Sequence, residues 1–323
     1  MRAVVYSAAG GPEVITVTER PEPMSGPGQV RVRVRAAGLN RADLLQRAGT
    51  YAAPKGWPVD IPGIEYAGEV DAVGAGVTRW KVGDRVMGLV GGGGHAEMVV
   101  VHADEAMAVP APLSLEEAAA IPEVFLTAYD ALTVRGRLAA GERVLLHAVG
   151  SGLGTAAAQL ARLMGATVLG TSRSAEKLER ARAYGLDIGI DTSKTPFRHA
   201  INEPVNLVID VLGGAAFADN LAVLAPRGRL VVLGWLTGSR VDADLAPLLH
   251  KRLEVIGTVM RSRSLTERLP LVRDFSERML PLFDGPAPRL VPVVGERYPM
   301  TAMAEAHRAM ERNTTFGKVI LTW

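Results

Sequence analysis

One stretch decides the fold of this chain: Val144-Leu145-Leu146-His147-Ala148-Val149-Gly150-Ser151-Gly152-Leu153-Gly154-Thr155. It begins as a short apolar run, turns through glycines and enters a helix-forming segment at 156–163, and a second apolar run follows at 167–171. Strand, glycine turn, helix and strand in this order are typical of a dinucleotide-binding βαβ unit. Glycines let the backbone approach a pyrophosphate, and the helix N-terminus presents unpaired N–H groups to its charge. We therefore expect the pyrophosphate to be bound by Ser151, Gly152, Leu153 and Gly154.

The glycine motif is imperfect, because a G-x-G-x-x-G pattern needs glycine where this chain has Thr155. The glycines stand at positions 150, 152 and 154 instead. An ordinary βα loop is the alternative interpretation of such a turn. The strand–turn–helix–strand context and the residues after the second strand favour the dinucleotide site.

The end of the second strand indicates which cofactor is bound. Sites specific for NAD usually carry Asp or Glu about 20 residues past the glycines, where it binds the ribose 2′-hydroxyl. This chain has Ser172 and Arg173 there, with Lys177 one helical turn further on, and its first acid is Glu176. Hydroxyls and cations suit the 2′-phosphate of NADPH, so the sequence predicts NADPH. The alternative is a solvated helix start with ordinary charges.

Composition excludes several classes of protein. The 323 residues are long enough for two domains, and 48% hydrophobic with 22% charged residues indicates a globular chain. The absence of cysteine excludes disulfides, thiolate metal sites and cysteine nucleophiles. Lys and Arg number 36 against 34 Asp and Glu, which is no nucleic-acid footprint. No signal-peptide pattern and no run of 18 apolar residues is present, so we expect a soluble cytoplasmic enzyme.

The pattern of elements changes along the chain. Alternating runs at 2–6 and 30–36, then glycine-bounded runs at 68–74, 83–88 and 95–101, predict a compact antiparallel β domain. Helices are predicted at 114–120, with Ser114 and Glu117 as a capping box, and at 127–134. Strands and helices alternate from there to a strand at 253–259, which predicts a parallel sheet with helices on both faces. A long helix at 267–283 and short strands at 291–294 and 317–321 follow.

In this order, several short motifs together resemble the medium-chain dehydrogenase/reductase family, and within it the zinc-free, zeta-crystallin-like quinone oxidoreductases. The resemblance covers essentially the whole chain. Its carriers are Gly10-Gly11-Pro12-Glu13, Leu39-Asn40-Arg41-Ala42-Asp43-Leu44, Gly83-Asp84-Arg85-Val86, Ala119-Ala120-Ile121-Pro122-Glu123, Leu126-Thr127-Ala128, Arg261-Ser262-Arg263 and Ala306-His307.

The resemblance implies a domain arrangement. A GroES-like catalytic domain, residues 1–122 completed by 264–323, would hold an inserted Rossmann domain, residues 123–263, with substrate and nicotinamide meeting in the cleft between them. Metal-ligand positions of the wider family match Asn40, Ile64 and Glu123, which cannot form the usual tetrahedral zinc site. A quinone needs no metal, because its carbonyls are already electrophilic. The resemblance also implies a homodimer that pairs through the strand at 253–259.

The resemblance places further residues in roles. Asn40 and Tyr51 would line the substrate side and donate hydrogen bonds to a quinone oxygen, although Leu45 replaces a second tyrosine that relatives often carry. Thr127 would lie near the nicotinamide; a helix-start hydroxyl is its other interpretation. Tyr51 could equally be a loop aromatic, and Trp235 a core residue. The remaining cofactor candidates are Thr192, Gly234, Trp235, Arg261, Asn313 and Lys318.

Two other functions stay open. The same fold and cofactor serve an enoyl or enone reductase that adds hydride to an activated C=C bond. A non-catalytic NADPH-binding protein is the second alternative, although RNA binding is disfavoured by the balanced charge. Quinone reduction by NADPH is the function that we predict, with a small-molecule quinone as the partner.

Overall fold

The computed structural model describes residues 1–287 and 289–323, and its chain forms two units. Unit 1 comprises Met1–Leu126 and Met260–Trp323, and unit 2 is the continuous segment Thr127–Val259. The divisions therefore fall after residues 126 and 259, whereas the sequence suggested 122 and 263.

A parallel six-stranded sheet is the centre of unit 2. Its order is β10-β9-β8-β11-β12-β13, and every neighbouring pair is parallel. β8, which comes first along the chain among these six strands, lies in the middle of the sheet. The strands that follow it are added first on one side (β9, β10) and then on the other (β11, β12, β13), so the strand order reverses between β8 and β11. Ligands of open α/β sheets bind at such a switch point, outside the carboxyl ends of the strands. The strands are β8 (Arg143–Leu146), β9 (Thr167–Ser172), β10 (Ile188–Asp191), β11 (Val205–Asp210), β12 (Leu224–Val232) and β13 (Glu254–Gly257).

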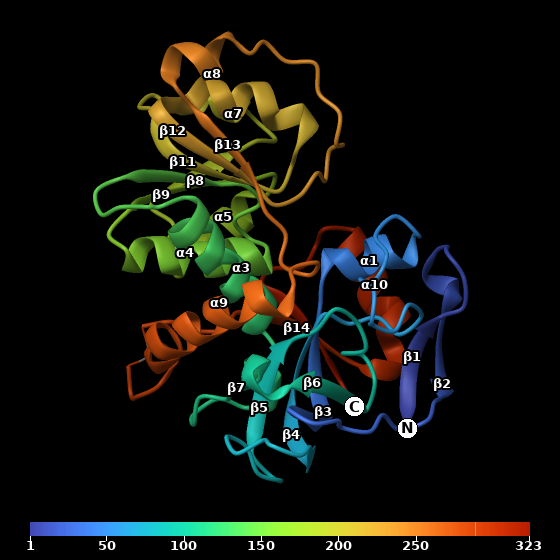
Figure 1. The fold of residues 1–323 in the computed structure, drawn as a ribbon. Helices are drawn as coiled ribbons and strands as arrows, with labels where there is room; N and C mark the ends of the chain where they lie inside the picture. The colour runs from blue at the N-terminus through green and yellow to red at the C-terminus, as the bar shows by residue number, and fades with distance from the viewer. Residues whose placement is uncertain (288) are drawn as a thin grey trace. The chain divides into compact units, whose positions relative to one another are not determined.

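Helices cover both faces of this sheet, with α4 and α5 on one side and α7 and α8 on the other (Figure 1). Leu145, Leu169, Val208 and Leu230 are fully buried between the layers. The helix predicted at 127–134 is wrong in its start: α3 already begins at Pro122, and a π-helix follows it at Asp130–Arg135. The helices are α3 (Pro122–Tyr129), α4 (Gly152–Leu163), α5 (Ala175–Arg182), α6 (Phe197–Ala200), α7 (Phe217–Val223) and α8 (Ala246–Lys251).

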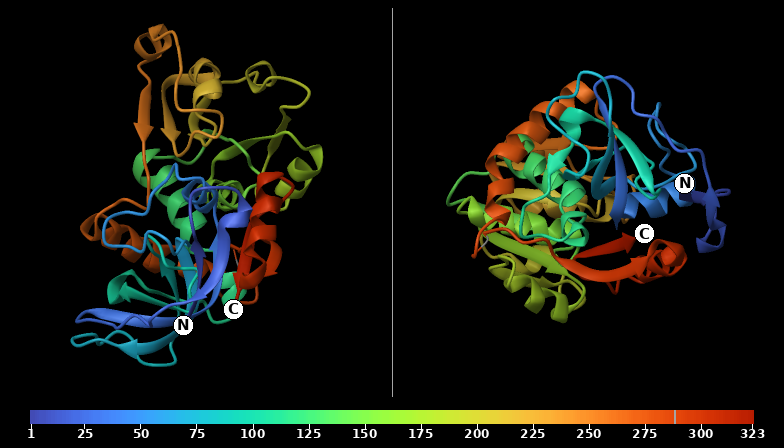
Figure 2. Two further views of the ribbon diagram at one scale, coloured as in Figure 1. Left: turned by 90° about the vertical axis from the view of Figure 1, so that its right-hand side faces the viewer. Right: turned by 90° about the horizontal axis from the view of Figure 1, so that it is seen from below.

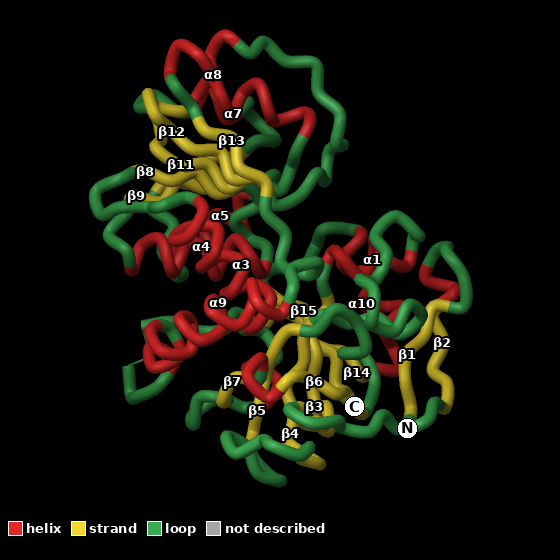
Figure 3. Tube along the Cα trace, in the orientation of Figure 1, coloured by secondary structure: helices red, strands yellow, loops and turns green. Residues whose placement is uncertain are grey.

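Unit 1 contains a seven-stranded sheet and a separate two-stranded ribbon, drawn in yellow in Figure 3. The large sheet runs β14-β15-β3-β4-β5-β7, and β6 pairs with β3. All its pairs are antiparallel except β14 with β15. The strands are β1 (Arg2–Tyr6), β2 (Ile15–Glu19), β3 (Gln29–Leu39), β4 (Glu65–Val73), β5 (Arg85–Leu89), β6 (Met98–His102), β7 (Met107–Ala108), β14 (Val294–Pro299) and β15 (Lys318–Thr322).

Strands from the two ends of the sequence lie side by side in unit 1: β15 pairs with β3 over residues 319–322 and 36–39, as the red and blue strands of Figure 2 show. The capping box of Ser114 and Glu117 is confirmed at the start of α2. The long helix ends early, at Arg278, and a 3₁₀ turn follows at Leu280–Phe283. The helices of unit 1 are α1 (Arg41–Arg47), α2 (Leu115–Ala118), α9 (Leu265–Arg278) and α10 (Met303–Glu311).

The expected fold class is confirmed: the segment that forms the doubly wound parallel sheet is inserted in the sequence of the mainly antiparallel β unit, which comes from the residues before and after it. The strand predicted at 291–294 is wrong, because β14 begins only at Val294.

Candidate functional site

The glycine turn of unit 2 lies at the carboxyl end of β8, beside the switch point of the sheet. Ala148 holds a left-handed backbone with φ +53°, which is costly for a residue with a Cβ. A Cβ on Gly154 would lie 2.5 Å from Val149 Cα and 2.6 Å from Ala148 O. Gly154 therefore allows the helix to pack against the turn, the part that the third glycine plays in dinucleotide-binding motifs.

The N-terminus of α4 offers the hydrogen-bond donors that a pyrophosphate requires. Ser151 caps this helix, and its Oγ accepts the N–H of Gly154 at 3.0 Å. That N–H is therefore already engaged, and Gly154 acts by packing rather than by binding phosphate. The N–H groups of Gly152 and Leu153 and the hydroxyl hydrogen of Ser151 are the donors that fit an anion here.

The structure brings Thr192, another cofactor candidate, next to the residues predicted to meet the 2′-phosphate, which are Ser172, Arg173 and Lys177. Thr192 N donates to Ser172 O at 2.9 Å, and the hydroxyl of Thr192 bonds to the same carbonyl at 3.3 Å. Ser174 caps α5 by accepting the N–H of Lys177 at 3.3 Å. Arg173 is exposed between them. One edge of unit 2, at the ends of β9 and β10, thus gathers two cationic side chains with several hydroxyls.

Two acids lie nearby, and each has its own cation. Glu176 pairs with Arg180 at 3.6 Å along the exposed face of α5. Asp191, aligned with Ser172 in the neighbouring strand, accepts bonds from the N–H and hydroxyl of Ser193 and pairs with Lys194 at 3.7 Å. The hydroxyl and N–H of Ser193 lower the pKa of Asp191, so this carboxylate is charged. Sequence reasoning missed Asp191, since this residue ends the third strand of the sheet rather than the second.

The ends of β11 and β12 form the other side of the switch point. Leu233 N donates to Asp210 O at 2.7 Å, which ties the segment after β12 to the end of β11. A Cβ on Gly213 would lie 2.7 Å from Trp235 Cα, so the two backbones touch. Trp235 is 55% exposed, which excludes the core interpretation of this residue. Gly234 and Trp235 stay candidates for cofactor contact.

A buried polar cluster organises unit 1 where β3, β4 and β15 meet α1. Lys318 Nζ donates to Asn40 Oδ1 at 2.7 Å, to Glu65 Oε1 at 2.5 Å and to Leu39 O at 3.2 Å. Asn40 Nδ2 donates to Glu65 Oε1 at 2.8 Å and, more weakly, to Gly38 O at 3.3 Å. Asn40, Glu65 and Lys318 are 9%, 0% and 4% exposed. We call these three residues the Lys318 cluster.

The Lys318 cluster corrects one expectation and bears on another. All three hydrogens of the Lys318 ammonium are donated within unit 1, so none remains for a cofactor phosphate, and its assignment to cofactor binding is withdrawn. The positions matching zinc ligands do not fit a metal either. Ile64 has no ligand atom, the amide of Asn40 is engaged, and an ammonium stands beside it.

Tyr51 and Arg261 form a second polar group in unit 1. The guanidinium of Arg261 lies 5.2 Å from the centre of the Tyr51 ring, which is a cation–π contact. Arg261 also donates to Gly91 O at 2.8 Å and to Gln46 Oε1 at 2.6 Å, and is buried. Burial raises the pKa of Tyr51, which outweighs the opposite effect of Arg261, so this phenol is neutral at physiological pH. The structure thus ties Arg261 to Tyr51 within unit 1.

The remaining candidates fall elsewhere. Thr127 lies in the last turn of α3, so it is not a helix-start hydroxyl. Asn313 follows α10 with φ +55°, and its side chain accepts from Arg41 at 2.8 Å and donates to Glu311 O at 3.0 Å. These bonds give Asn313 a part in ending the helix.

Buried residues to which the sequence analysis assigned no role hold α1 in place. Asp43 accepts the N–H groups of Asn40 at 2.8 Å and Gly63 at 3.2 Å. The hydroxyl of Tyr6 donates to Asp43 O and contacts His307 Nε2, and both distances are 3.3 Å. Burial lowers the pKa of His307 to about 3, so its neutral ring can accept from Arg47 at 3.0 Å. This chain of bonds fixes the helix that begins directly after Asn40.

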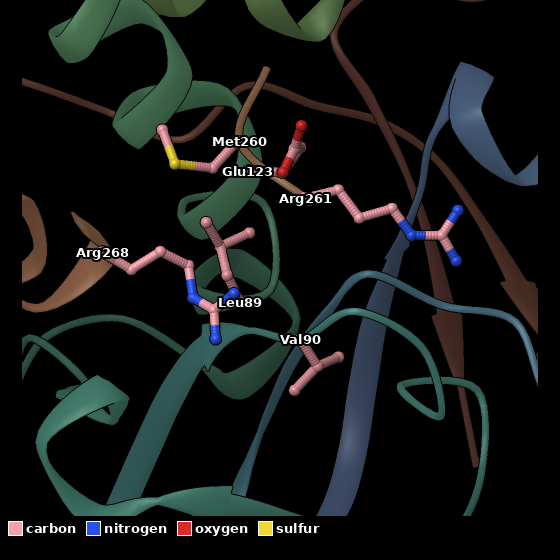
Figure 4. A pocket seen from close by; sticks show the side chains of 6 residues that line it. All are labelled: Leu89, Val90, Glu123, Met260, Arg261 and Arg268. Carbon is pink, nitrogen blue, oxygen red and sulfur yellow. The ribbon is translucent and has the colours of Figure 1, made fainter. Parts of the chain in front are cut away.

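A small cavity lies in unit 1 beside these groups. It is lined by Leu89, Val90, Glu123, Met260, Arg261 and Arg268, and Figure 4 shows the Arg261 side chain extending away from Met260 and Arg268. Its volume of ≈ 10 Å³ is about that of one water probe. A cavity of this size has room for one water molecule.

Residues 1–287 and 289–323 contain no group of three or more His, Cys, Asp and Glu side chains suited to hold a metal ion. None of the helices formed by these residues has the length and hydropathy needed to span a membrane.

Comparison with known protein families identifies both units. The alcohol dehydrogenase GroES-like domain matches residues 26–111, and the zinc-binding dehydrogenase family matches residues 152–278. The chain belongs to the medium-chain dehydrogenase/reductase family, whose members combine these two domains.

Curated relatives and solved structures match over the whole chain. A quinone oxidoreductase of Pseudomonas aeruginosa is 34% identical over 99% of both chains. The human synaptic vesicle membrane protein VAT-1 homolog is 34% identical over 99% of this chain and 86% of its own. The Escherichia coli quinone oxidoreductase complexed with NADPH has a TM-score of 0.89, with 27% identity and full coverage of both chains. The CurK enoyl reductase has a TM-score of 0.86, with 27% identity over 99% of this chain and 98% of its own. Fold and relatives together support an NAD(P)H-dependent oxidoreductase.

Proposed function

We propose that this protein is an NADPH-dependent quinone oxidoreductase that works without a metal ion. The observation that carries the proposal is its full-length similarity to a quinone oxidoreductase, with 34% identity over 99% of both chains. The chemistry of the Lys318 cluster supports the metal-free part, because Asn40 and Ile64 cannot serve as the ligands of a tetrahedral zinc site.

NADPH is the proposed cofactor because of the residues at the end of β9. Arg173 and Lys177 provide two cations, and Ser172 and Thr192 provide hydroxyls beside them. Charge-assisted hydrogen bonds of this kind favour a phosphate over a ribose hydroxyl. The nearby acids Glu176 and Asp191 are each paired with a cation, which limits their repulsion of a 2′-phosphate.

The reduced nicotinamide supplies a hydride at its C4 atom when the cofactor is bound. A quinone that accepts the hydride becomes a hydroquinone anion, which takes a proton from water to give the neutral hydroquinone. The tasks of the protein are to hold the ring and to stabilise the negative oxygen. We assign the second task to the Tyr51 hydroxyl and to Asn40 Nδ2, both of which are neutral donors.

Asn40 can take this part only through its weaker bond. Its Nδ2 makes a 2.8 Å bond to Glu65 and a 3.3 Å bond to Gly38 O, so the second hydrogen is the one available to a substrate. Thr127 is proposed as a further contact of the nicotinamide, with Gly234 and Trp235 beside it on the basis of their place at the switch point.

The experiment that tests this function is NADPH oxidation against a panel of ortho-quinones, para-quinones, enones and enoyl thioesters. Quinones should give the highest kcat/KM. Faster turnover of an enone or enoyl thioester would instead establish the alternative, double-bond reduction, which the likeness to the CurK enoyl reductase favours. NADPH binding without turnover of any of these compounds would establish a non-catalytic binding protein.

A further inference from the structure

The Lys318 cluster joins residues that are far apart in the sequence. Asn40 caps α1, Glu65 begins β4 and Lys318 begins β15. The second carboxylate oxygen of Glu65, Oε2, accepts the N–H of Glu123 at 2.8 Å, near the start of α3. The starts of α1, β4 and β15 and the first turn of α3, whose residues up to Leu126 belong to unit 1, thus converge on one buried carboxylate and one buried ammonium.

The cluster leaves no space for a larger group. A Cβ on Gly38 would lie 2.1 Å from Glu65 Oε1 and 2.9 Å from Lys318 Cε, so only glycine fits there. Each hydrogen of the ammonium has an oxygen acceptor within 3.2 Å. Complete pairing is what makes a buried charge tolerable in a protein interior.

The two charges allow only one orientation of the Asn40 amide. With Oδ1 toward the ammonium and Nδ2 toward the carboxylate, both contacts are attractive. Rotating the amide by half a turn would place its NH2 group against Lys318 and its oxygen against Glu65, which makes both contacts repulsive. The ion pair therefore determines that Asn40 presents hydrogens, and never its oxygen, on the Nδ2 side.

The second Nδ2 hydrogen can leave its present acceptor at little cost. That acceptor, Gly38 O, also lies 3.3 Å from His95 Nε2. Burial lowers the pKa of His95, so its ring is neutral and can donate through Nε2. If the second Nδ2 hydrogen of Asn40 leaves Gly38 O and bonds to a ligand oxygen, His95 Nε2 still donates to this carbonyl, which is then not left unpaired.

We propose that Lys318 is the positioning residue of the substrate site: it orients and polarises the Asn40 amide so that this amide donates to a developing oxygen anion. This inference rests on the proposed function, in which Asn40 contacts the quinone. A hydrogen bond received at Oδ1 strengthens the donation made at Nδ2, because linked hydrogen bonds polarise one another. The substrate class that fits such a donor is a carbonyl compound whose reduction leaves negative charge on oxygen.

The decisive test compares Lys318→Met with the double variant Lys318→Met/Glu65→Gln. The single variant leaves an unpaired buried carboxylate, so both Tm and kcat for quinone should fall, kcat by about tenfold or more. The double variant removes both charges, so it should recover most of the Tm but not the kcat. NADPH affinity, measured by fluorescence titration, should not change in either variant.

A matched control is available in unit 2. Arg229 and Glu142 form another largely buried ion pair, at 2.7 Å, and neither is a candidate site residue. Glu142 directly precedes β8, whereas the glycine turn follows this strand. Arg229→Met should lower the Tm and leave kcat at the wild-type value. A double variant with restored Tm and wild-type kcat would show that Lys318 is only structural, and a large loss of NADPH affinity in Lys318→Met would return it to the cofactor site. Either result overturns the proposal.

A measurement without turnover separates this proposal from the proposed function. The side-chain amide of Asn40 gives a ¹⁵N NMR signal that Asn40→Ala identifies by its loss. This signal should move in Lys318→Met and stay in place in Arg229→Met. If wild-type protein reduces no quinone, the proposed function fails while a moved signal still supports the positioning of Asn40; an unmoved signal refutes the positioning whatever the turnover.

Discussion

Tyr51 offers the simplest test at the scale of a single residue. Its phenol is neutral and lies against the Arg261 guanidinium, which suits a hydrogen-bond donor rather than a proton donor at neutral pH. Loss of one such hydrogen bond costs about 1–3 kcal/mol, so Tyr51→Phe should lower kcat/KM for quinone by about ten- to a hundredfold. Steady-state kinetics with a fixed quinone would measure this.

A matched control for Tyr51 is Tyr298→Phe, which removes a hydroxyl bonded to Glu296 in β14. This variant should keep wild-type kinetics. Wild-type turnover in Tyr51→Phe would reduce Tyr51 to loop packing, whereas complete loss of turnover would assign it an obligatory acid role.

We propose that single side chains also decide the choice of cofactor. Replacing Arg173 and Lys177 together by Ala would remove the two charge-assisted contacts that we propose with the 2′-phosphate, each worth about 1.5–3 kcal/mol. The KM for NADPH should then rise at least about tenfold, while the KM for NADH stays nearly constant. Arg182→Ala, on the same helix but paired with Glu179, is the control and should change neither value. Equal losses for both cofactors would refute a 2′-phosphate site.

Whether the place of a residue in the site could be predicted depended on whether its partners are close to it in the sequence. Ser172, Arg173 and Lys177 are close along the chain, so their common position could be predicted. Glu65 and Lys318 are separated by 253 positions, and nothing local marks either as buried. The sequence therefore predicts Lys318 at the cofactor and assigns no role to Glu65.

At the scale of elements, the edge strand β13 predicts how two copies associate. It pairs with β12 on one side, and in the described part of the chain no strand pairs with its other side. Val255 in this strand is 43% exposed. An open edge with exposed apolar residues favours antiparallel pairing with its own copy about a two-fold axis. Light scattering at micromolar concentration should therefore give the mass of a homodimer.

A pair of substitutions makes the dimer prediction specific to β13. Val255→Lys places a charge on that edge and should shift the mass to a monomer. Ile188→Lys places the same charge on β10, at the opposite edge of the sheet, where Ile188 is 40% exposed. The β10 variant should remain a dimer. A dimer in both variants would show that the interface is not at β13, and a monomeric wild type would refute the dimer.

Elements with a strong local pattern could be predicted, and those that depend on distant contacts could not. The capping box at Ser114 and the βαβ unit around Gly152 have their signals within a few residues. The π-helix at Asp130–Arg135 has no such signal, and its Asp130 bonds instead to Thr258, far along the chain. β14 was predicted too early because Pro292 lies in an apolar run that reads as a strand.

For the whole molecule, we predict that activity does not depend on a metal. Exhaustive dialysis against EDTA should leave quinone turnover unchanged, and elemental analysis should find no stoichiometric zinc. The reason is the donor set around Asn40, which supplies an ammonium where a metal would need anionic or imidazole ligands. One zinc per chain that is required for turnover would contradict this.

The two-unit organisation could be predicted because the chain changes from short antiparallel strand patterns to alternating strands and helices, and then back to short strands. Which strands of unit 1 come together could not, since β15 lies between β14 and β3 although 279 positions separate Leu39 from Lys318. Sequence patterns show which residues face a core, but the pairing of distant strands depends on the total packing.

The position of β15 also gives the molecule an order of completion during synthesis. Unit 2 is continuous, so all of it is synthesised before the second part of unit 1. Until Lys318 emerges, the sheet of unit 1 lacks a strand between β14 and β3, and the carboxylate of Glu65 lacks its counter-charge. A nascent chain stalled before this residue would contain all of unit 2 and a unit 1 whose sheet has an open edge, the kind of surface that chaperones and proteases recognise. β15 is synthesised after every other strand of unit 1, so it completes both the large sheet and the pairing of the Glu65 carboxylate.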